Sequence, residues 1–320
     1  MNKKPYLFPI VIILVAIISM LFYKKSDNQG IQETLTSENR IVVATTIFPL
    51  FSIANEIAGE KITVINILPP GASPHTFEPS PNTIAELQSA KILFSIGHGA
   101  DDWTKNLISQ PELDDLKLVY VDDGINIKSI QSENNVTEIN LNSTEEEHDE
   151  HGSEDPHYWL SGVNGELIAK TIELEFENLD PANKDTYQKN LDVFLKNLET
   201  VNQNIIKSFA TLPNKSIITH HGAWFYFADA YGLNIQGVFE LAPGLEPTAN
   251  DIARLQSAIT SKKVAAVFIE PQLSSQIVQS FIGDTGARVG VLDPLGGVEN
   301  RMSYIELLQY NAQIIENALK

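Results

Sequence analysis

The chain has 320 residues, which is too long for one small domain and suits two lobes of ordinary size. Its formal net charge of −19 argues against a nucleic-acid partner, because phosphate binding requires basic stripes; a cation is a more natural ligand. There is no cysteine, which excludes disulfides, thiolate metal sites and cysteine nucleophiles, so any metal site must use His, Asp, Glu or water.

The first 25 residues contain an apolar run from Pro5 to Tyr23 with two lysines on each side. This run is about long enough to span a bilayer, and its charged start also resembles a signal peptide. No small-x-small cleavage site follows it, so we expect residues 1–25 to be an uncleaved membrane anchor, with a cleaved signal as the alternative. Either way the remainder is exported, and the polar residues 26–39 form a flexible tether.

The next part of the chain, residues 40–179, is predicted to be an N-terminal lobe. Short apolar runs that favour strands alternate with helical patterns; the predicted strands are 41–45, 62–68, 91–96 and 117–121. Runs that are apolar on both faces indicate a parallel sheet covered by helices. Residues 131–155 break this alternation, because they are rich in Asn, Ser and Glu without an apolar period, and are predicted to be a mobile loop.

Residues 180–213 contain the clearest single element, a long helix. Asp180 is a good N-cap and Pro181 suits the first helical position. Apolar residues then recur at three- and four-residue steps, namely Leu191, Phe194, Leu195, Leu198, Val201, Ile205 and Phe209. A helix of this length, on the order of 45 Å, can join two lobes.

Residues 214–320 repeat the alternation and form the predicted C-terminal lobe. Strands are expected at 216–219, 235–239, 264–269 and 288–292, and a last helix at about 303–319. The predicted fold is therefore α/β, with two lobes that each hold a roughly four-stranded parallel sheet flanked by helices, joined by one long backbone helix.

Four potential metal ligands lie in four separate segments. In parallel α/β sheets, ligand groups gather after the carboxyl ends of strands. His75, His221 and Asp293 each follow a predicted strand, and His157 follows the acidic loop. Three neutral imidazoles and one carboxylate form a tetrahedral set that zinc accepts.

Each of these residues, taken alone, could instead have a structural role without metal binding. His75 alone is typical of a surface histidine, His221 could cap the following helix, and Asp293-Pro294 could begin a turn. His98 is expected beside the site or on the surface rather than on the metal. His220 is left out because it points away from its neighbour if the strand persists. Together, however, the four candidates fit one site better than chance.

Five motifs resemble the metal-binding substrate-binding proteins of ABC importers for zinc and manganese: "PPGASPHTFEPSP", "DPHYWLS", "HHGAWFYFADAYGL", "FIEPQLS" and "GVLDPLGG". The resemblance runs from about Arg40 to the C-terminus and implies one metal held between two lobes by His75, His157, His221 and Asp293. It also implies that His148 and His151 belong to an auxiliary metal-collecting loop; a solvated acidic linker is the alternative.

The resemblance favours a high-affinity Zn²⁺-binding component without catalysis, which delivers the ion to a permease and its ATPase. Manganese is the less favoured metal, and an adhesin or extracellular metal buffer is a further alternative. A zinc hydrolase would need an open coordination position and a base, for which Glu270 or Glu78 could serve, but there is no HExxH pair. We expect a monomer that is anchored to the cell membrane and faces outside, or a periplasmic protein if the N-terminal segment is cleaved.

Overall fold

The computed structural model describes residues 40–129, 137–138, 154–239, 249–271, 278–279 and 282–320. The predicted anchor and tether, and His148 and His151 of the acidic loop, lie outside these residues. In the part that is described, no helix is long and apolar enough to cross a membrane.

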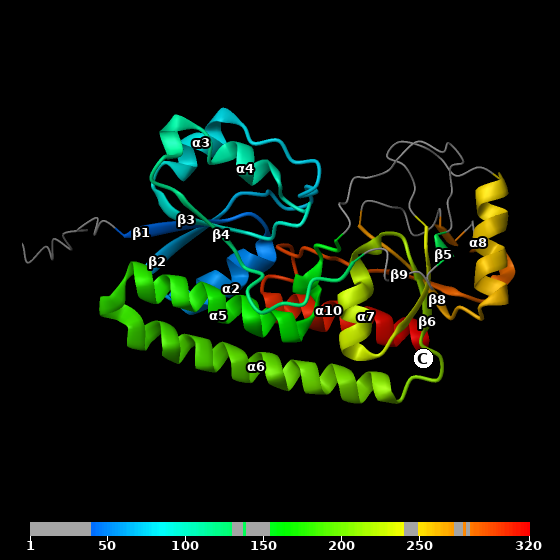
Figure 1. Cartoon of the computed structure of the whole chain (residues 1–320). Coiled ribbons are helices and arrows are strands. Elements are labelled where there is room, and N and C mark those ends of the chain that lie inside the picture. The colour runs from blue at the N-terminus through cyan, green and yellow to red at the C-terminus, as the bar shows by residue number, and fades with distance from the viewer. Residues whose placement is uncertain (1–39, 130–136, 139–153, 240–248, 272–277, 280–281) are drawn as a thin grey trace, which may run out of the picture. The chain divides into compact units, whose positions relative to one another are not determined.

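The first sheet contains four parallel strands in the order β2-β1-β3-β4 (Figure 1). They are β1 (Ile41–Thr45), β2 (Ile62–Asn66), β3 (Ala90–Ser95) and β4 (Lys117–Tyr120). The connecting helices are α2 (Phe48–Ala58), α3 (Pro81–Leu87), α4 (Trp103–Leu107) and the 3-10 turn η1 (Pro111–Leu113). All four strands were predicted, with ends within two residues, because their buried apolar runs are bounded by polar turns.

The second sheet contains five parallel strands in the order β5-β7-β6-β8-β9. Four of them were predicted: β6 (Ser216–Thr219), β7 (Asn234–Val238), β8 (Ala266–Ile269) and β9 (Arg288–Val291). The fifth, β5 (Thr137–Glu138), comes from the segment predicted to be an irregular loop and pairs with β7. A two-residue strand leaves no periodic signal, so only its partner strand reveals it.

The remaining helices of the second half are short, apart from α8. They are η5 (Gly222–Trp224), α7 (Phe225–Tyr231), α8 (Ala249–Ser261) and η6 (Gly283–Thr285). Leu255 and Ile259 of α8 lie in a cluster of buried residues with Val267 of β8, so this helix covers one face of the second sheet.

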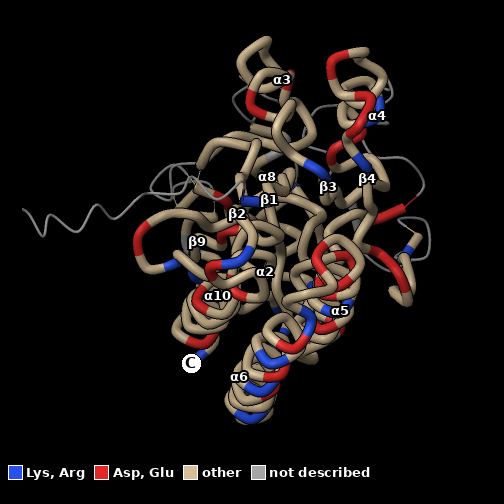
Figure 2. Tube along the Cα trace, turned by 90° about the vertical axis from the view of Figure 1, so that its left-hand side faces the viewer, with Lys and Arg blue, Asp and Glu red and all other residues tan. Residues whose placement is uncertain are grey.

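Three longer helices connect the two sheets: α5 (Gly162–Leu179), α6 (Lys184–Ala210) and α10 (Tyr304–Leu319). Helix α6 packs against α2 and α5 of the first half and against α7 and α10 of the second. One contiguous hydrophobic cluster includes Val43 of β1, Phe194 of α6 and Phe268 of β8. The long helix therefore joins the two halves as predicted, with charged residues along its length (Figure 2).

The start of α6 differs from the prediction. Residues Pro181–Asn183 form a 3-10 turn, η4, and the α-helix begins at Lys184. Asp180 does not cap the helix; its carboxylate accepts hydrogen bonds from the Tyr187 hydroxyl (2.6 Å) and the Asn183 amide (2.7 Å). The side chain of Tyr187 thus competes successfully with the backbone for the predicted capping oxygen. At 27 residues the helix is about 40 Å long.

Candidate metal centre

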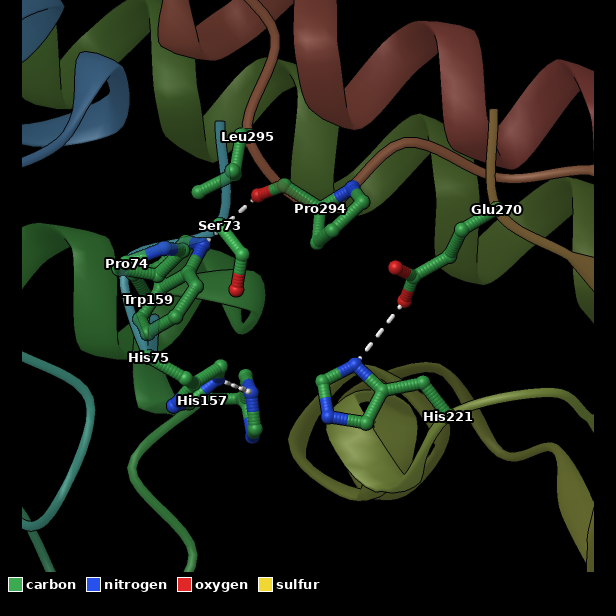
Figure 3. A pocket seen from close by; sticks show the side chains of 9 residues that line it. All are labelled: Ser73, Pro74, His75, His157, Trp159, His221, Glu270, Pro294 and Leu295. Carbon is green, nitrogen blue, oxygen red and sulfur yellow. Dashed lines mark hydrogen bonds and ion pairs between the residues drawn. The ribbon is translucent and has the colours of Figure 1, made fainter. Parts of the chain in front are cut away.

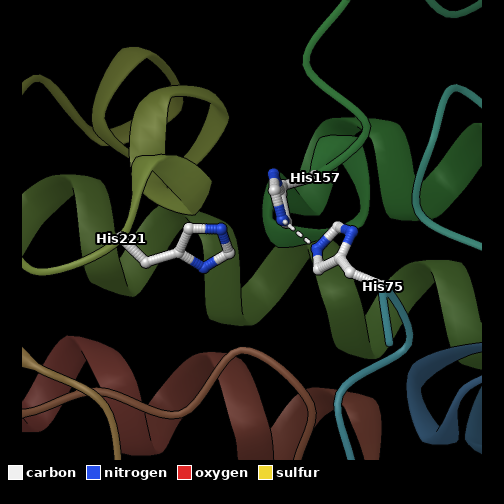
Figure 4. A group of neighbouring side chains, drawn as sticks. All are labelled: His75, His157 and His221. Carbon is white, nitrogen blue, oxygen red and sulfur yellow. Dashed lines mark hydrogen bonds between the residues drawn. The ribbon is translucent and has the colours of Figure 1, made fainter. Parts of the chain in front are cut away.

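Three of the four predicted ligands lie together. His75, His157 and His221 each offer a ring nitrogen, and the three atoms lie within 4.8 Å of one another (Figure 4). The Nε2 atoms of His75 and His157 are 3.3 Å apart, and the ring centroids of His157 and His221 are 4.8 Å apart. Three imidazoles that converge at this spacing are an arrangement suited to one transition-metal ion.

The positions of the three histidines follow from the topology. His75 lies in the connection from β2 to α3, and His221 follows β6 closely, so both lie beyond the carboxyl ends of their strands. His157 immediately precedes a 3-10 turn, η3 (Tyr158–Leu160). It is only 3% exposed, whereas His75 and His221 are half-buried.

The outer nitrogen of each imidazole has an oxygen partner. Nδ1 of His157 lies 2.8 Å from Oδ1 of Asp155, and Nδ1 of His221 lies 3.1 Å from Oε1 of Glu270. Nδ1 of His75 lies 3.4 Å from the carbonyl oxygen of Gly99. These oxygens are acceptors for a ring N–H, so this arrangement favours the neutral tautomer with the proton on Nδ1 and the Nε2 lone pair available to a metal.

The segment that carries His157 is bound to several parts of the molecule. The Tyr158 hydroxyl donates to the carbonyl of Ile96 (2.9 Å), and Trp159 Nε1 donates to the carbonyl of Pro294 (2.8 Å). The Tyr304 hydroxyl, at the start of α10, donates to the carbonyl of Trp159 (2.6 Å). Hydrogen bonds to both halves of the molecule therefore hold this turn in place.

A small cavity lies against the three imidazoles (Figure 3). Its free volume of about 30 Å³ can hold an ion or a water molecule. The residues that line it are Ser73, Pro74, His75, His157, Trp159, His221, Glu270, Pro294 and Leu295. Glu270 is the only carboxylate among these lining residues.

The fourth predicted ligand, Asp293, has other partners. Its Oδ1 accepts the backbone N–H groups of Leu295 and Gly296, each at 2.9 Å, and its Oδ2 accepts from Arg301 Nε at 2.7 Å. It is therefore not part of the three-histidine group in the described structure. The signal "LDP" in the sequence correctly placed Asp293 after a strand but contained no information about Arg301, eight residues further on.

The other two described histidines lie apart from the three. His98 bridges two carboxylates, with Nδ1 2.7 Å from Glu154 and Nε2 2.8 Å from Asp122. Burial opposes its charging, but the hydrogen bonds to Glu154 and Asp122 raise the pKa of His98 above its usual value. His220 packs against Phe239, and burial lowers the pKa of its imidazole to about 4. Neither ring belongs to the group of three imidazoles in the described structure.

The residues that support the three imidazoles were not predicted from the sequence. Asp155, Trp159, Tyr304 and Gly99 had no assigned role, and Glu270 was considered only as a possible catalytic base. The signal for Asp155 was present in "DPH", because an Asp two residues before a histidine can accept both its backbone N–H and its ring N–H, as it does here at 2.9 Å and 2.8 Å. Tyr304 gave no such signal, since it is distant in the sequence.

The fold and the three-imidazole site together define a class, the metal-binding substrate-binding proteins. The chain belongs to the family described as ZnuA, zinc-uptake complex component A, periplasmic, whose sequence model matches residues 43–318. A crystal structure of ZnuA is similar to the chain with a TM-score of 0.72 and 29% identity, and the match covers 88% of this chain and all of that one.

Relatives that are named for two different metals are about equally similar to this chain. The manganese ABC transporter substrate-binding lipoprotein PsaA of Streptococcus pneumoniae is 26% identical over 96% of this chain and 97% of its own length. The zinc-binding lipoprotein AdcA of the same organism is 24% identical over 95% of this chain but only 60% of its own length. The chain is therefore a metal-binding component of an ABC importer and not an enzyme, which excludes the hydrolase alternative.

Proposed function

We propose that the chain captures Zn²⁺ outside the cytoplasmic membrane and delivers it to an ABC permease that is driven by an ATPase. The observation that carries this proposal is the group of three imidazoles with ring nitrogens within 4.8 Å of one another. Nitrogen ligands place zinc well above manganese in the affinity order of divalent ions, and each added imidazole strengthens this preference. Zinc also accepts a four-coordinate shell, which a small cavity can enclose.

The proposed ligands are His75, His157 and His221, with Asp293 as the fourth. For Asp293 to bind, the ion must share its carboxylate with Arg301 and the backbone N–H groups of Leu295 and Gly296, or displace one of them. Replacement of Asp293 by Asn tests this step by titration calorimetry. A lower zinc affinity is the expected result, whereas parental affinity would mean that water completes the shell.

Attachment to the membrane is proposed to occur through residues 1–25. The relatives are named lipoproteins, but this chain has no cysteine to carry a lipid, so its apolar segment is the feature that could hold it at the membrane. N-terminal sequencing of the mature protein tests this proposal. A mature start near Ser26 would show instead that the segment is a removed signal.

Metal preference is tested best at His221. Replacement by Glu leaves two imidazoles and a harder, more negative set of ligands, so zinc affinity should fall and its advantage over manganese should narrow. His220→Ala is the matched control, because His220 is the adjacent imidazole and lies outside the group. Competition calorimetry with the two metals should show a change for His221→Glu and little change for His220→Ala; the reverse result would overturn the assignment.

The pH dependence of binding gives a second test of the same ligands. Imidazoles must lose their protons to bind a metal, and an ordinary histidine has a pKa of about 6.5. Zinc affinity should therefore fall steeply below about pH 6. An affinity that is constant between about pH 7 and pH 5 would show that carboxylates, rather than the three imidazoles, hold the ion.

A further inference from the structure

We propose that Glu270 is a positioning residue of the metal site, which accepts the Nδ1–H of His221 and thereby directs the Nε2 lone pair of that ring at the ion. This inference rests on the proposed function, since it concerns how the same site holds its metal. It differs from the possible role of Glu270 as a base, because the carboxylate acts on a ligand and not on a substrate.

The topology of the second sheet brings the two residues together. Strands β6 and β8 are neighbours, with Thr219 paired to Phe268. Glu270 follows the end of β8 directly, and His221 lies two residues beyond the end of β6. The backbone N–H of His220 donates to the carbonyl of Phe268 at 2.7 Å, which extends the pairing towards the site. The carboxylate and the imidazole are therefore held by adjacent strand ends.

The surroundings of Glu270 suit this role. The residue is 9% exposed, and its Oε1 lies 3.1 Å from His221 Nδ1 (Figure 3). Among the residues that the structure describes, no lysine or arginine forms an ion pair with it. A buried carboxylate requires a donor, because an unsatisfied charge in such a place is strongly destabilising. The His221 N–H is the donor that the described structure provides.

Asp293 provides an internal contrast. It also follows a strand of the same sheet, β9, which is the other neighbour of β8. Its carboxylate is already bound to Arg301 and to the turn at 295–296. Two acids at adjacent strand ends therefore have different partners in this structure: Asp293 binds Arg301 and a turn, whereas Glu270 contacts the imidazole of His221. Of the two, Glu270 alone lines the cavity.

The expected consequence is a change in metal affinity and in the tautomer of one ring. Loss of an oxygen that orients a metal-bound histidine typically lowers metal affinity about 10–100-fold. Without Glu270 the proton of His221 is free to move to Nε2, which then has no lone pair for the ion. A substitution that damages packing alone would lower stability without changing the tautomer, so the two effects can be separated.

The test compares Glu270→Ala, Glu270→Gln and the control Glu78→Ala, which removes the same charge from an exposed position. Zinc affinity is measured by calorimetry at about pH 8, where ordinary imidazoles are neutral. The His221 tautomer is read from ¹⁵N chemical shifts of the metal-free protein, with the ring assigned by its loss in His221→Asn. Thermal melts report whether each variant is folded.

We expect His221 to carry its proton on Nδ1 in the unchanged chain and in Glu78→Ala, and to lose this preference in Glu270→Ala together with about 10–100-fold in zinc affinity. Glu270→Gln can still accept through its amide oxygen, so it should retain the tautomer and lose less affinity. Parental affinity and tautomer in a folded Glu270→Ala would overturn the inference alone. An unchanged chain that binds no zinc would overturn the proposed function as well.

Discussion

His157 and His75 are both proposed zinc ligands, yet they are held in different ways. His157 is buried, and it lies between an Asp that binds it twice and a turn that Tyr304 and Trp159 fix to other parts of the molecule. His75 is half-buried in a loop between a strand and a helix, and its ring contacts the carbonyl of Gly99 at 3.4 Å. One ligand is thus part of the core, while the other depends on a surface connection.

Each of the two segments is nevertheless attached by a tryptophan. Trp159 Nε1 donates to the carbonyl of Pro294, and Trp103 Nε1 donates to the carbonyl of Pro74, next to His75. Trp159 is 1% exposed and Trp103 is half-buried. The His157 segment is therefore attached through the buried core, whereas the contact that attaches the His75 loop is partly open to solvent.

The largest effect is expected from Trp159→Ala. Removal of a fully buried aromatic side chain lowers the free energy of unfolding by about 3–5 kcal/mol. The variant should therefore unfold at a much lower denaturant concentration and bind zinc weakly. Trp103→Ala is the matched control and should cost clearly less, because its ring is only partly buried. Chemical denaturation of both variants without metal measures the difference; equal losses would abolish the distinction between the two segments.

Asp155→Ala should give the next largest effect, on metal affinity. It removes the oxygen that accepts both the backbone and the ring N–H of His157, and we expect zinc affinity to fall about 10–100-fold. Asp155→Asn retains an accepting oxygen, so its zinc affinity should fall less. Calorimetry provides the measurement. If both variants bind zinc as the unchanged chain does, then burial and the neighbouring turn, not Asp155, hold His157 in place.

His98 should make the stability of the protein near the His157 segment depend on pH, and this effect should be smaller. It bridges Asp122 and Glu154, its ring lies beside that of Tyr158, and the two hydrogen bonds raise its pKa despite partial burial. A raised pKa in the folded state stabilises the protein fully below the unfolded value of about 6.5, and this contribution is lost as pH rises through the folded value.

We expect this contribution to be about 1 kcal/mol, because the exposure of Glu154 screens one of the two ion pairs. In His98→Gln the fall in stability above about pH 6.5 should be absent. Denaturation at a series of pH values tests this. If the stability of His98→Gln falls with rising pH as steeply as that of the unchanged chain, then other groups cause the pH dependence.

The smallest effect is expected from Glu173→Gln, which should stabilise the chain, whereas the other substitutions should weaken it. Burial first, and then the hydrogen bond and charge of Glu177, raise the pKa of Glu173 to about 7. The folded chain therefore binds a proton that the unfolded chain has lost, and stability falls as pH rises from about 4.5 to about 7. At pH 8 the variant should be more stable by up to about 1 kcal/mol, or roughly 2 °C.

Glu199→Gln is the control for this change, because it removes one exposed charge from α6, the helix that packs against α5. It should shift the melting temperature less than Glu173→Gln does. Equal shifts would indicate that the net charge of the chain, and not the buried carboxylate, determines the effect.

The local pattern of the sequence was sufficient for the architecture. Eight strands were predicted close to their observed ends, because a buried parallel strand must be apolar on both faces and a turn must interrupt it. The same reasoning placed His75 after the end of β2 in the first sheet and His221 after the end of β6 in the second, where the structure has them. Both inferences use interactions between residues that are near one another in the chain.

Only the tertiary structure decided which polar side chains contact one another around the three imidazoles. In the folded chain Arg301 and the turn at 295–296 bind the carboxylate of Asp293, whereas the carboxylate of Glu270 lies beside His221. Likewise, Asp180 bonds Tyr187 instead of capping α6, and β5 exists because β7 lies beside it. A polar side chain selects its partner by distance and burial in the folded chain, and neither quantity is contained in the spacing of residues along the sequence.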